Sequence, residues 1–182
     1  TYGFQRHYLT GEIIDSGISF ANSVCYEDII LNKETRTVCI QKPLVLDLGA
    51  VAKGLAVDLA ARELSRFEGF VIDAGGDIYA GGKNERVKPW VIGIQHPLNK
   101  METICSFRLS DTAICTSGSY ERVSPVQKQI HHLILPQSGE SSSELVSCTV
   151  IAPFTMMADA FSTAAFLLGP NNGLALLEQV GL

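Results

Sequence analysis

The sequence predicts an α+β fold in which a mainly antiparallel sheet packs against a few helices. Short runs rich in β-branched residues recur between turn signals, as expected for antiparallel strands. Two longer segments instead show the apolar spacing of helices. The chain of 182 residues is 46% hydrophobic and 18% charged, and it contains no repeat and no long linker. A chain of this length and composition can bury a core. We therefore expect residues 1–182 to form a single domain.

The first half of the chain is predicted to contain several strands and one helix. The expected strands are residues 24–32, 37–41 and 44–48 (LVLDL), with a hairpin turn at 32–35 (NKET). From residue 50 the period changes, because Val51, Leu55, Leu59 and Leu64 recur at helical spacing. We expect this helix to run over residues 50–67 and to stop near Gly69.

The second half is predicted to be rich in strands and to end in helices. The expected strand regions are residues 70–82, broken by a Gly-Gly bend, then 89–97, 106–122, 131–136 and 145–153. A long helix should open near Thr155, with the Thr155 hydroxyl as its cap. Gly169-Pro170 is a common stop signal, and the following residues should form a further short helix.

Composition excludes several classes of protein. The net charge of −5 argues against a nucleic-acid binder, which usually presents a basic face. No run reaches the ~18 apolar residues that a membrane span needs, and the polar start, TYGFQRHYLTGE, does not read as a signal peptide. The five cysteines have no CxxC spacing, so neither a zinc site nor a disulfide framework is expected. Unpaired cysteines favour a reducing compartment.

The segment MMADAFSTAAFLLGP, residues 156–170, places a carboxylate in an apolar helix. On a helix Asp159 and Thr163 are i and i+4, so they lie on one face, with Ser162 close by at i+3. A carboxylate with hydroxyl oxygens is a partial hard-oxygen site of the kind that suits Mg²⁺. The alternative is that Asp159 caps a backbone group or faces solvent.

The segment LDLGAVAKG, residues 46–54, joins a predicted strand ending at Asp47 to a helix carrying Lys53 in its first turn. Helix N-termini attract anions, so the combination suits a phosphate or pyrophosphate. It contains neither a Walker A motif (GxxxxGK[ST]) nor a GxGxxG motif. The alternative is an ordinary strand–turn–helix with a solvated lysine.

Two further loops could contact a ligand. In DAGGDIYAGG, Asp73 and Asp77 flank a Gly-Gly pair that allows close approach of a backbone, although a bulged hairpin with solvated aspartates explains the same pattern. In CTSGSYER, Thr116, Ser117 and Gly118 could hold a phosphate or a sugar, or form only a polar turn. A nucleophilic serine is not indicated, because the GxSxG elbow is missing.

The adjacent histidines His131 and His132 would point to opposite faces of a strand. A metal site that uses both is therefore disfavoured. One of them could be catalytic while the other is structural.

Six segments, in this order, resemble those of one family. They are residues 46–58, 71–82, 90–97, 113–122, 131–139 and 146–170. The family is that of the FAD:protein FMN transferases, the ApbE-type flavin transferases. The resemblance runs from about residue 24 onward, and it implies an ApbE-like fold related to the T-fold.

The resemblance also implies an activity. Such enzymes bind FAD and Mg²⁺, cleave the pyrophosphate, release AMP and attach FMN to a Thr or Ser hydroxyl of a target flavoprotein. By resemblance, the metal ligands are Asp159, Thr163 and the backbone carbonyl of Ala50, with Ser162 nearby. The resemblance implies Asp47, Lys53 and Leu133 as flavin-nucleotide positions, and we expect the loop residues Thr116, Ser117 and Gly118 to bind the same nucleotide. The catalytic base is either Asp47 or His132, and Lys53 with the helix amides would steady phosphate charge.

The chain departs from the family pattern at particular points. Leu135 and Ser119 stand where the family commonly has Asp. A substantial N-terminal portion that helps to form the FAD pocket in the family is absent from this sequence. The same site could therefore act as an FAD pyrophosphatase giving FMN and AMP, or as a catalytically incomplete flavin-nucleotide-binding module. A homodimer or a complementary N-terminal portion are possible partners. Family members are typically bacterial and often exported or lipid-anchored.

Overall fold

The computed structural model describes residues 10–14, 24–120, 122–124, 127, 130–136 and 138–182. Contacts within the chain divide it into two compact units, Thr1–Asp47 and Leu48–Leu182. Each unit is considered by itself. The expectation of a single domain therefore stays a prediction.

The first unit contains a small hairpin. A 3-10 turn at Tyr26–Asp28 leads into β1 (Ile29–Asn32), which pairs antiparallel with β2 (Thr37–Ile40). The side chain of Asn32 accepts a hydrogen bond from the backbone N–H of Thr35 at 3.0 Å, which closes the predicted turn. The hairpin was thus predicted correctly. The strand predicted over residues 44–48 is wrong, because that stretch has no strand partner and is irregular.

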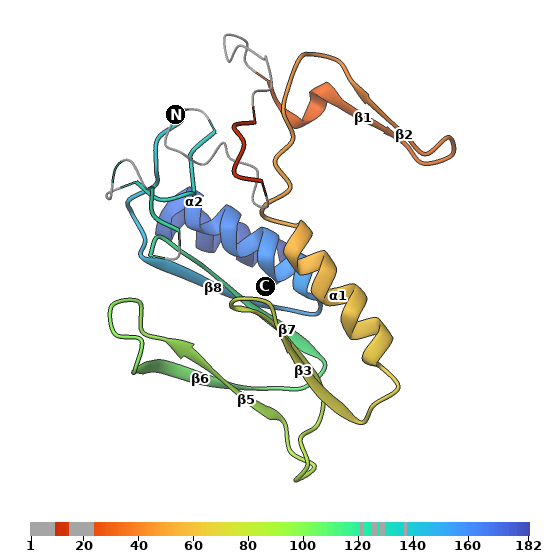
Figure 1. The fold of residues 1–182 in the computed structure, drawn as a ribbon, viewed down its shortest axis with the longest axis vertical. Helices are drawn as coiled ribbons and strands as arrows, with labels where there is room; N and C mark the ends of the chain where they lie inside the picture. Colours follow the sequence, from red (N-terminus) through yellow and green to blue (C-terminus); the bar gives the residue numbers. More distant parts are fainter. Residues whose placement is uncertain (1–9, 15–23, 121, 125–126, 128–129, 137) are drawn as a thin grey trace. The chain divides into compact units, whose positions relative to one another are not determined.

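The second unit is built on a four-stranded antiparallel sheet in the order β3-β4-β7-β8. The strands are β3 (Gly69–Asp73), β4 (Asp77–Gly82), β7 (Thr112–Gly118) and β8 (Ser147–Ala152). The helices α1 (Ala52–Leu64) and α2 (Thr155–Val180) lie on one face of this sheet (Figure 1). The hairpin of β5 (Trp90–Gln95) and β6 (Thr103–Leu109) lies on the other face. The predicted α+β class is confirmed.

Alternation along the strands divides the core into two layers. Ala113 and Cys115 of β7 pack with Ala158 of α2 on the helix side. Ile114, between them, packs with Ile94 of β5 on the hairpin side. Successive side chains of a strand point to opposite faces, so the sheet is buried on both sides. β7 lies between β4 and β8 and takes part in both layers.

Two predicted boundaries are wrong for tertiary reasons. The first helix ends at Leu64, and Gly69 begins β3 instead of stopping the helix. A Cβ at Gly69 would lie 1.7 Å from the carbonyl oxygen of Lys83, so this glycine is required by a close approach of two chain segments. Residues 131–136 form no strand, and only isolated bridges, Val123 with His131 and Ile134 with Ser141, occur there.

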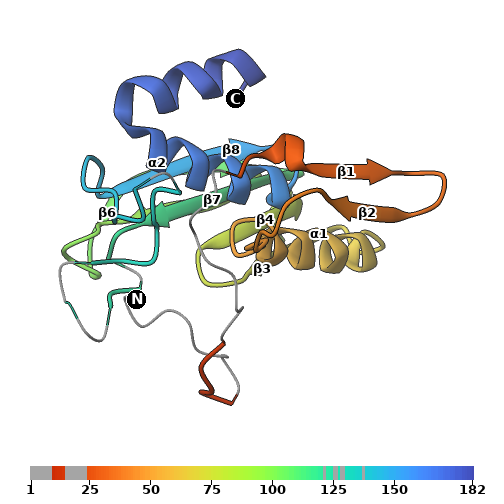
Figure 2. The same cartoon turned by 90° about the horizontal axis from the view of Figure 1, so that it is seen from above.

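Helix α2 changes direction at the predicted stop. Gly169 has φ +77° and ψ 177°, which is not helical, and Pro170 follows it. The helical path resumes at once and turns to a new direction (Figure 2). A Cβ at Gly173 would lie 2.5 Å from the carbonyl oxygen of Ala165, so the second segment packs tightly against the first. The Gly-Pro signal therefore marks a kink between two consecutive helical segments.

The N-terminus of α2 is capped by α1 and not by its own sequence. The predicted Thr155 cap is wrong, because Thr155 is the first helical residue and Phe154 at the cap position makes no side-chain cap. Instead the Asp58 carboxylate accepts hydrogen bonds from the backbone N–H groups of Thr155 (2.6 Å) and Met156 (2.8 Å). These are two of the N–H groups that a helix start leaves without partners. Asp58 therefore ties the two helices together.

We predict that Asp58→Ala destabilises the chain by about 1–2 kcal/mol, the usual cost of losing an N-cap. The reason is that two backbone donors at the start of α2 lose their acceptor. Denaturant unfolding measures the change, with Glu63→Ala, an exposed position on α1, as the control. Equal stability of the two variants would show that the cap contributes nothing.

Candidate functional site

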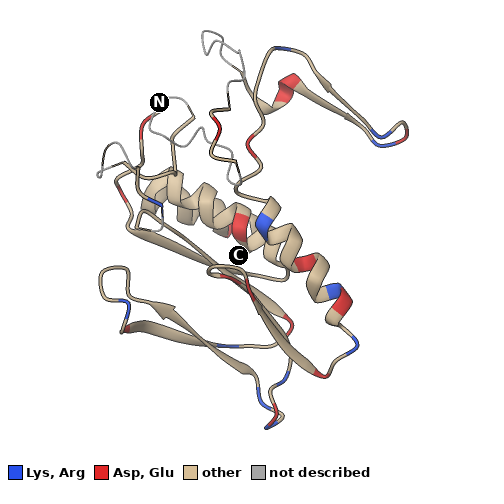
Figure 3. Cartoon of the chain, in the orientation of Figure 1, with Lys and Arg blue, Asp and Glu red and all other residues tan. Residues whose placement is uncertain are grey.

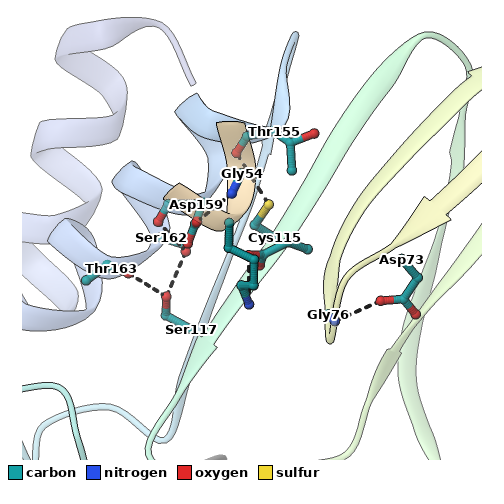
Figure 4. Close-up of polar contacts among 11 residues, drawn as sticks. Gly54, Asp73, Gly76, Cys115, Ser117, Thr155, Asp159, Ser162 and Thr163 are labelled. Atoms are coloured by element: carbon teal, nitrogen blue, oxygen red, sulfur yellow. Dashed lines mark hydrogen bonds and ion pairs between the residues drawn. The ribbon is translucent and has the colours of Figure 1, made fainter. Parts of the chain in front are cut away.

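Asp159 is buried in α2 and its partner is the start of α1. The charged residues of α2 are Asp159 and Glu178, and most of its ribbon is uncharged in Figure 3. The Oδ2 atom of Asp159 accepts a hydrogen bond from the backbone N–H of Gly54 at 3.1 Å (Figure 4). Burial, with Asp77 as the next cause, raises the pKa of Asp159 to about 6. The carboxylate is thus held in a setting that disfavours its charge.

This hydrogen bond frees a backbone oxygen. In a regular helix the N–H of Gly54 would donate to the carbonyl of Ala50, four residues earlier. Here that N–H goes to Asp159, whereas the next amide, that of Leu55, donates to Val51 in the regular way. The Ala50 carbonyl is therefore left out of the helical ladder, at the turn that Asp159 contacts.

Close packing of α1 on α2 makes the contact possible. A Cβ at Gly54 would lie 2.6 Å from the Cα of Met156 and 2.7 Å from the carbonyl oxygen of Thr155. Any side chain at this position would push the helices apart, since such distances are far inside van der Waals contact. The glycine thus brings its own N–H within reach of Asp159.

A chain of hydroxyl groups links α2 to β7. The Ser162 hydroxyl donates to the carbonyl oxygen of Asp159 at 3.0 Å. The Ser117 hydroxyl lies 2.8 Å from the Ser162 hydroxyl and 2.9 Å from the Thr163 hydroxyl. A hydroxyl has a single proton, so Ser117 must donate to Ser162, and Thr163 must then donate to Ser117. The donor and the acceptor of each bond in this chain therefore follow from the bond that Ser162 donates to Asp159.

The direction of this hydrogen-bonded chain fixes the orientation of the Thr163 hydroxyl. The Thr163 proton points to Ser117, so the lone pairs of the Thr163 oxygen point in other directions. Ser162 is fully buried, and its oxygen both donates and accepts within the chain. Among the predicted metal ligands, Thr163 is therefore better prepared than Ser162 to offer an oxygen. The assignment of Ala50, Asp159, Ser162 and Thr163 as ligands stays a prediction.

Lys53 is not a freely solvated residue. Its ammonium lies 2.8 Å from the Oδ2 atom of Asp77, although its side chain is still 46% exposed. Asp77 is 2% exposed and begins β4 directly after the Gly-Gly bend. Both bend glycines have positive φ, and the N–H of Gly76 donates to Asp73 at 2.9 Å. The DAGGD motif is a hairpin turn that carries one aspartate into the site.

The start of α1 offers fewer amides to an anion than its sequence suggests. The N–H groups of Val51 and Ala52 donate to the carbonyl of Leu48, and that of Gly54 donates to Asp159. These donors are already used inside the protein. Lys53 is thus the main positive group at this helix start.

Thr116 and Gly118 are not brought together with Asp159. Thr116 pairs with Thr149 of β8 through their hydroxyls at 2.8 Å, and alternation places it on the opposite face of β7 from Ser117. It lines a separate cavity of about 330 Å³ between the sheet and the β5–β6 hairpin. A Cβ at Gly118 would lie 2.7 Å from the Tyr120 ring, so this glycine makes room for an aromatic side chain.

The two histidines have different roles. His131 is buried, its Nε2 meets the carbonyl of Ser142, and its Nδ1 accepts the N–H of Leu133 at 3.3 Å. A carbonyl only accepts, so Nε2 is the ring nitrogen that donates in this contact. Its ring packs edge-on against Phe166. His131 is therefore structural.

His132 is half-buried, and burial is the first cause that lowers its pKa. Its Nδ1 lies 3.4 Å from the carbonyl of Arg122, and Lys53 is among the charges that depress its pKa. Of the two histidines it is the one suited to proton transfer. Leu133 is buried next to it. Asp47 is exposed and belongs to the other unit, so its role stays a prediction.

Cys115 lies beside the site but is chemically protected. Its Sγ is 3.6 Å from the carbonyl oxygen of Thr155, and burial followed by the charge of Asp77 raises its pKa far above the ordinary value. A thiol held protonated is a poor nucleophile. All five cysteines are free thiols.

Sequence reasoning noted Asp77 but gave it no role. A feature of the sequence that could have indicated a role for Asp77 is its position, because it is the charged first residue of a strand whose other residues are apolar or small. Gly54 was missed altogether, because nothing local shows that a second helix crosses there.

No group of three or more His, Cys, Asp or Glu side chains that could hold a metal ion occurs among the described residues. The oxygen atoms linked to Asp159 by hydrogen bonds are instead those of the Ser162, Ser117 and Thr163 hydroxyls. In the described part of the chain no helix is long and apolar enough to cross a membrane.

The sequence model of the ApbE family matches residues 6–182. An FAD:protein FMN transferase of Haemophilus influenzae is 35% identical over 158 residues, which are 83% of this chain and 46% of that protein. An Escherichia coli K12 protein of the same name is 34% identical over 144 residues, covering 76% and 41% of the two chains.

Solved structures agree with this assignment. The ApbE protein of Thermotoga maritima superposes with a TM-score of 0.77 at 32% identity, over 86% of this chain and 52% of that one. The flavinyl transferase ApbE of Pseudomonas stutzeri superposes with a TM-score of 0.69 at 30% identity, over 85% and 48%. This chain spans about half the length of the curated relatives that it matches. The family match over nearly all of the sequence shows that the chain belongs to the ApbE family.

Proposed function

We propose that this chain takes part in Mg²⁺-dependent transfer of FMN from FAD to a Thr or Ser hydroxyl of a target protein, with release of AMP. Relatives named FAD:protein FMN transferase support this reaction class. The observation that carries the proposal is the hydrogen bond from Gly54 to Asp159, which joins the two helices that carry the three oxygen atoms proposed as ligands. They are the Asp159 carboxylate, the Thr163 hydroxyl and the Ala50 carbonyl.

These oxygens fit a hard cation. Mg²⁺ takes oxygen ligands, uses few from the protein and completes its coordination with water and phosphate. Bound there, it would offset the charge that develops on the pyrophosphate oxygens. Asp159 fits this role on physical grounds, because a buried carboxylate with one neutral donor gains from a cation.

Lys53 supplies the second positive group. Its flexible, half-exposed side chain extends from the first turn of α1, next to the residue that holds Asp159. An ammonium there would bind phosphate as a point charge. In this proposal Lys53 binds the phosphate charge that the free backbone amides of the helix were expected to bind.

His132 is the candidate base that belongs to the second unit. Burial lowers its pKa, so near neutral pH the imidazole is uncharged and can accept the proton of the incoming hydroxyl. Asp47 remains the alternative base, as the family resemblance implies.

Incubation with FAD, Mg²⁺ and a threonine-containing acceptor peptide of a target flavoprotein tests the proposal. We expect the peptide to gain the mass of FMN, with one AMP released for each transfer. Formation of FMN and AMP without peptide labelling would favour the pyrophosphatase. Flavin binding without turnover would favour a catalytically incomplete binding module.

We predict that Asp159→Asn lowers Mg²⁺-dependent turnover by at least about 100-fold, since even outer partners of a metal site typically contribute ~10–100-fold. The amide keeps the shape of the side chain, so the fold should be retained. Turnover and circular dichroism are compared with those of Glu178→Gln, which neutralises the other charge of α2. Full activity of Asp159→Asn would refute the metal assignment.

We predict that Ser117→Ala weakens binding of Mn²⁺, used as a probe for Mg²⁺, by roughly tenfold, as expected for a residue that orients a ligand. The Thr163 hydroxyl loses its acceptor and can rotate. Electron paramagnetic resonance titration measures the affinity. Thr149→Val is the control, because it removes a different hydroxyl pair on the neighbouring strand. Unchanged affinity in Ser117→Ala would mean that Thr163 needs no such support.

A further inference from the structure

Asp77 carries a buried charge that the proposed reaction does not use. It is 2% exposed, and its Oδ2 accepts no hydrogen bond of good geometry among the described residues. Its Oδ2 atom forms an ion pair with the ammonium of Lys53 at 2.8 Å, and its side chain also contacts those of Asp159 and Cys115. A carboxylate is rarely buried without a charge partner, so Lys53 accounts for the presence of Asp77 in the core.

A second buried carboxylate lies nearby. Asp159 interacts electrostatically with both Asp77 and Lys53, although it comes from α2 and they come from β4 and α1. Lys53 is adjacent in sequence to Gly54, whose N–H holds Asp159. Three charged groups from three elements therefore share one small region of the second unit.

The charges in this region do not balance. Two carboxylates face a single ammonium, so one negative charge remains without a cation. A divalent cation beside Asp159 would balance both carboxylates, and the ammonium would then be surplus. The Lys53 side chain is 46% exposed and can leave Asp77, whereas Asp77 is held in the core.

We propose that Lys53 is the resident counter-ion of the Asp77–Asp159 pair, and that a divalent cation displaces its ammonium from Asp77 and frees it for phosphate. This inference rests on the metal site of the proposed function. Asp77 then acts as a positioning residue that holds Lys53 beside the site until the cation arrives. Cation binding and phosphate binding are coupled through the position of this one side chain.

The opposite view is that the Lys53–Asp77 pair is a permanent tie between α1 and β4. The two views differ in the effect of removing the lysine. A counter-ion competes with the metal, so its removal should tighten metal binding. A permanent tie does not compete, so its removal should leave metal binding unchanged or weaken it by disturbing the fold.

The test is Mn²⁺ titration of the 182-residue chain, as wild type and as Lys53→Met, followed by electron paramagnetic resonance and by thermal unfolding. We expect Lys53→Met to bind Mn²⁺ about tenfold more tightly, because a unit charge at close range is removed. Without metal its melting temperature should fall, because Asp77 stays buried without a cation. Saturating Mn²⁺ should remove this difference from the wild type.

Three further variants make the result specific. Lys53→Arg keeps the charge and should resemble the wild type, and Lys83→Met removes an exposed lysine of the same unit as the matched control. In an Asp77→Asn background, Lys53→Met should no longer lower the metal-free melting temperature or tighten Mn²⁺ binding. This double-mutant cycle isolates the pair. If Lys53→Met alone is too unstable to study, Asp77→Asn can still be compared with the double variant.

The outcomes separate this inference from the proposed function. If the wild type binds Mn²⁺ but Lys53→Met binds it equally or more weakly, the counter-ion proposal is refuted and the metal site stands. If the effect of Lys53→Met persists unchanged in the Asp77→Asn background, Asp77 is not the partner and the proposal is likewise refuted. If neither the wild type nor any variant binds Mn²⁺, the metal site of the proposed function fails as well.

Discussion

The hydrogen bond from the Gly54 N–H to the Asp159 carboxylate is the contact on which the arrangement of the site depends. It fixes the start of α1 against α2, holds a buried carboxylate and releases the Ala50 carbonyl from the helical ladder. At the same contact between the helices, Asp58 of α1 caps the N-terminus of α2. Each helix thus supplies the polar group that the other lacks at their contact. Without this reciprocal pairing, a buried aspartate and two buried amides would each carry a desolvation cost.

Small residues make such a crossing possible. Gly54 allows the backbones of the two helices to approach, and Ala158 of α2 packs directly on the sheet. Close packing brings Ser117 of β7 within hydrogen-bond distance of two hydroxyls of α2. The polar chain that results is partly buried, and each proton in it has an assigned acceptor. Such a network is favourable when every member is satisfied, and it holds Thr163 in one orientation.

In the proposed function, the second unit supplies groups for a cation and for phosphate charge from segments far apart in the sequence. Asp159 and Thr163 come from α2, Lys53 and Ala50 from the start of α1, and Asp77 from β4. The chain spans about half the length of its curated relatives, and Asp47 belongs to the first unit. The chemistry proposed here therefore concerns the metal and pyrophosphate end of the reaction. The contact of Leu133 with the flavin ring stays a prediction.

Local sequence was sufficient for features that depend on local spacing. We could predict the pattern around Asp159 and Thr163, the β1–β2 hairpin and most strands of the sheet. The reason is that helical and strand periodicity depends on residues close together in the sequence. Collinear motifs identified the family. Residues 44–48 and 131–136 were misassigned because a β-rich composition does not supply a strand partner. The pairings of Lys53 with Asp77, Ser117 with Thr163 and Gly54 with Asp159 join segments that lie far apart in the chain, and no local pattern encodes them. Only the packing of α1 and α2 on the sheet decided which charges and hydroxyls meet.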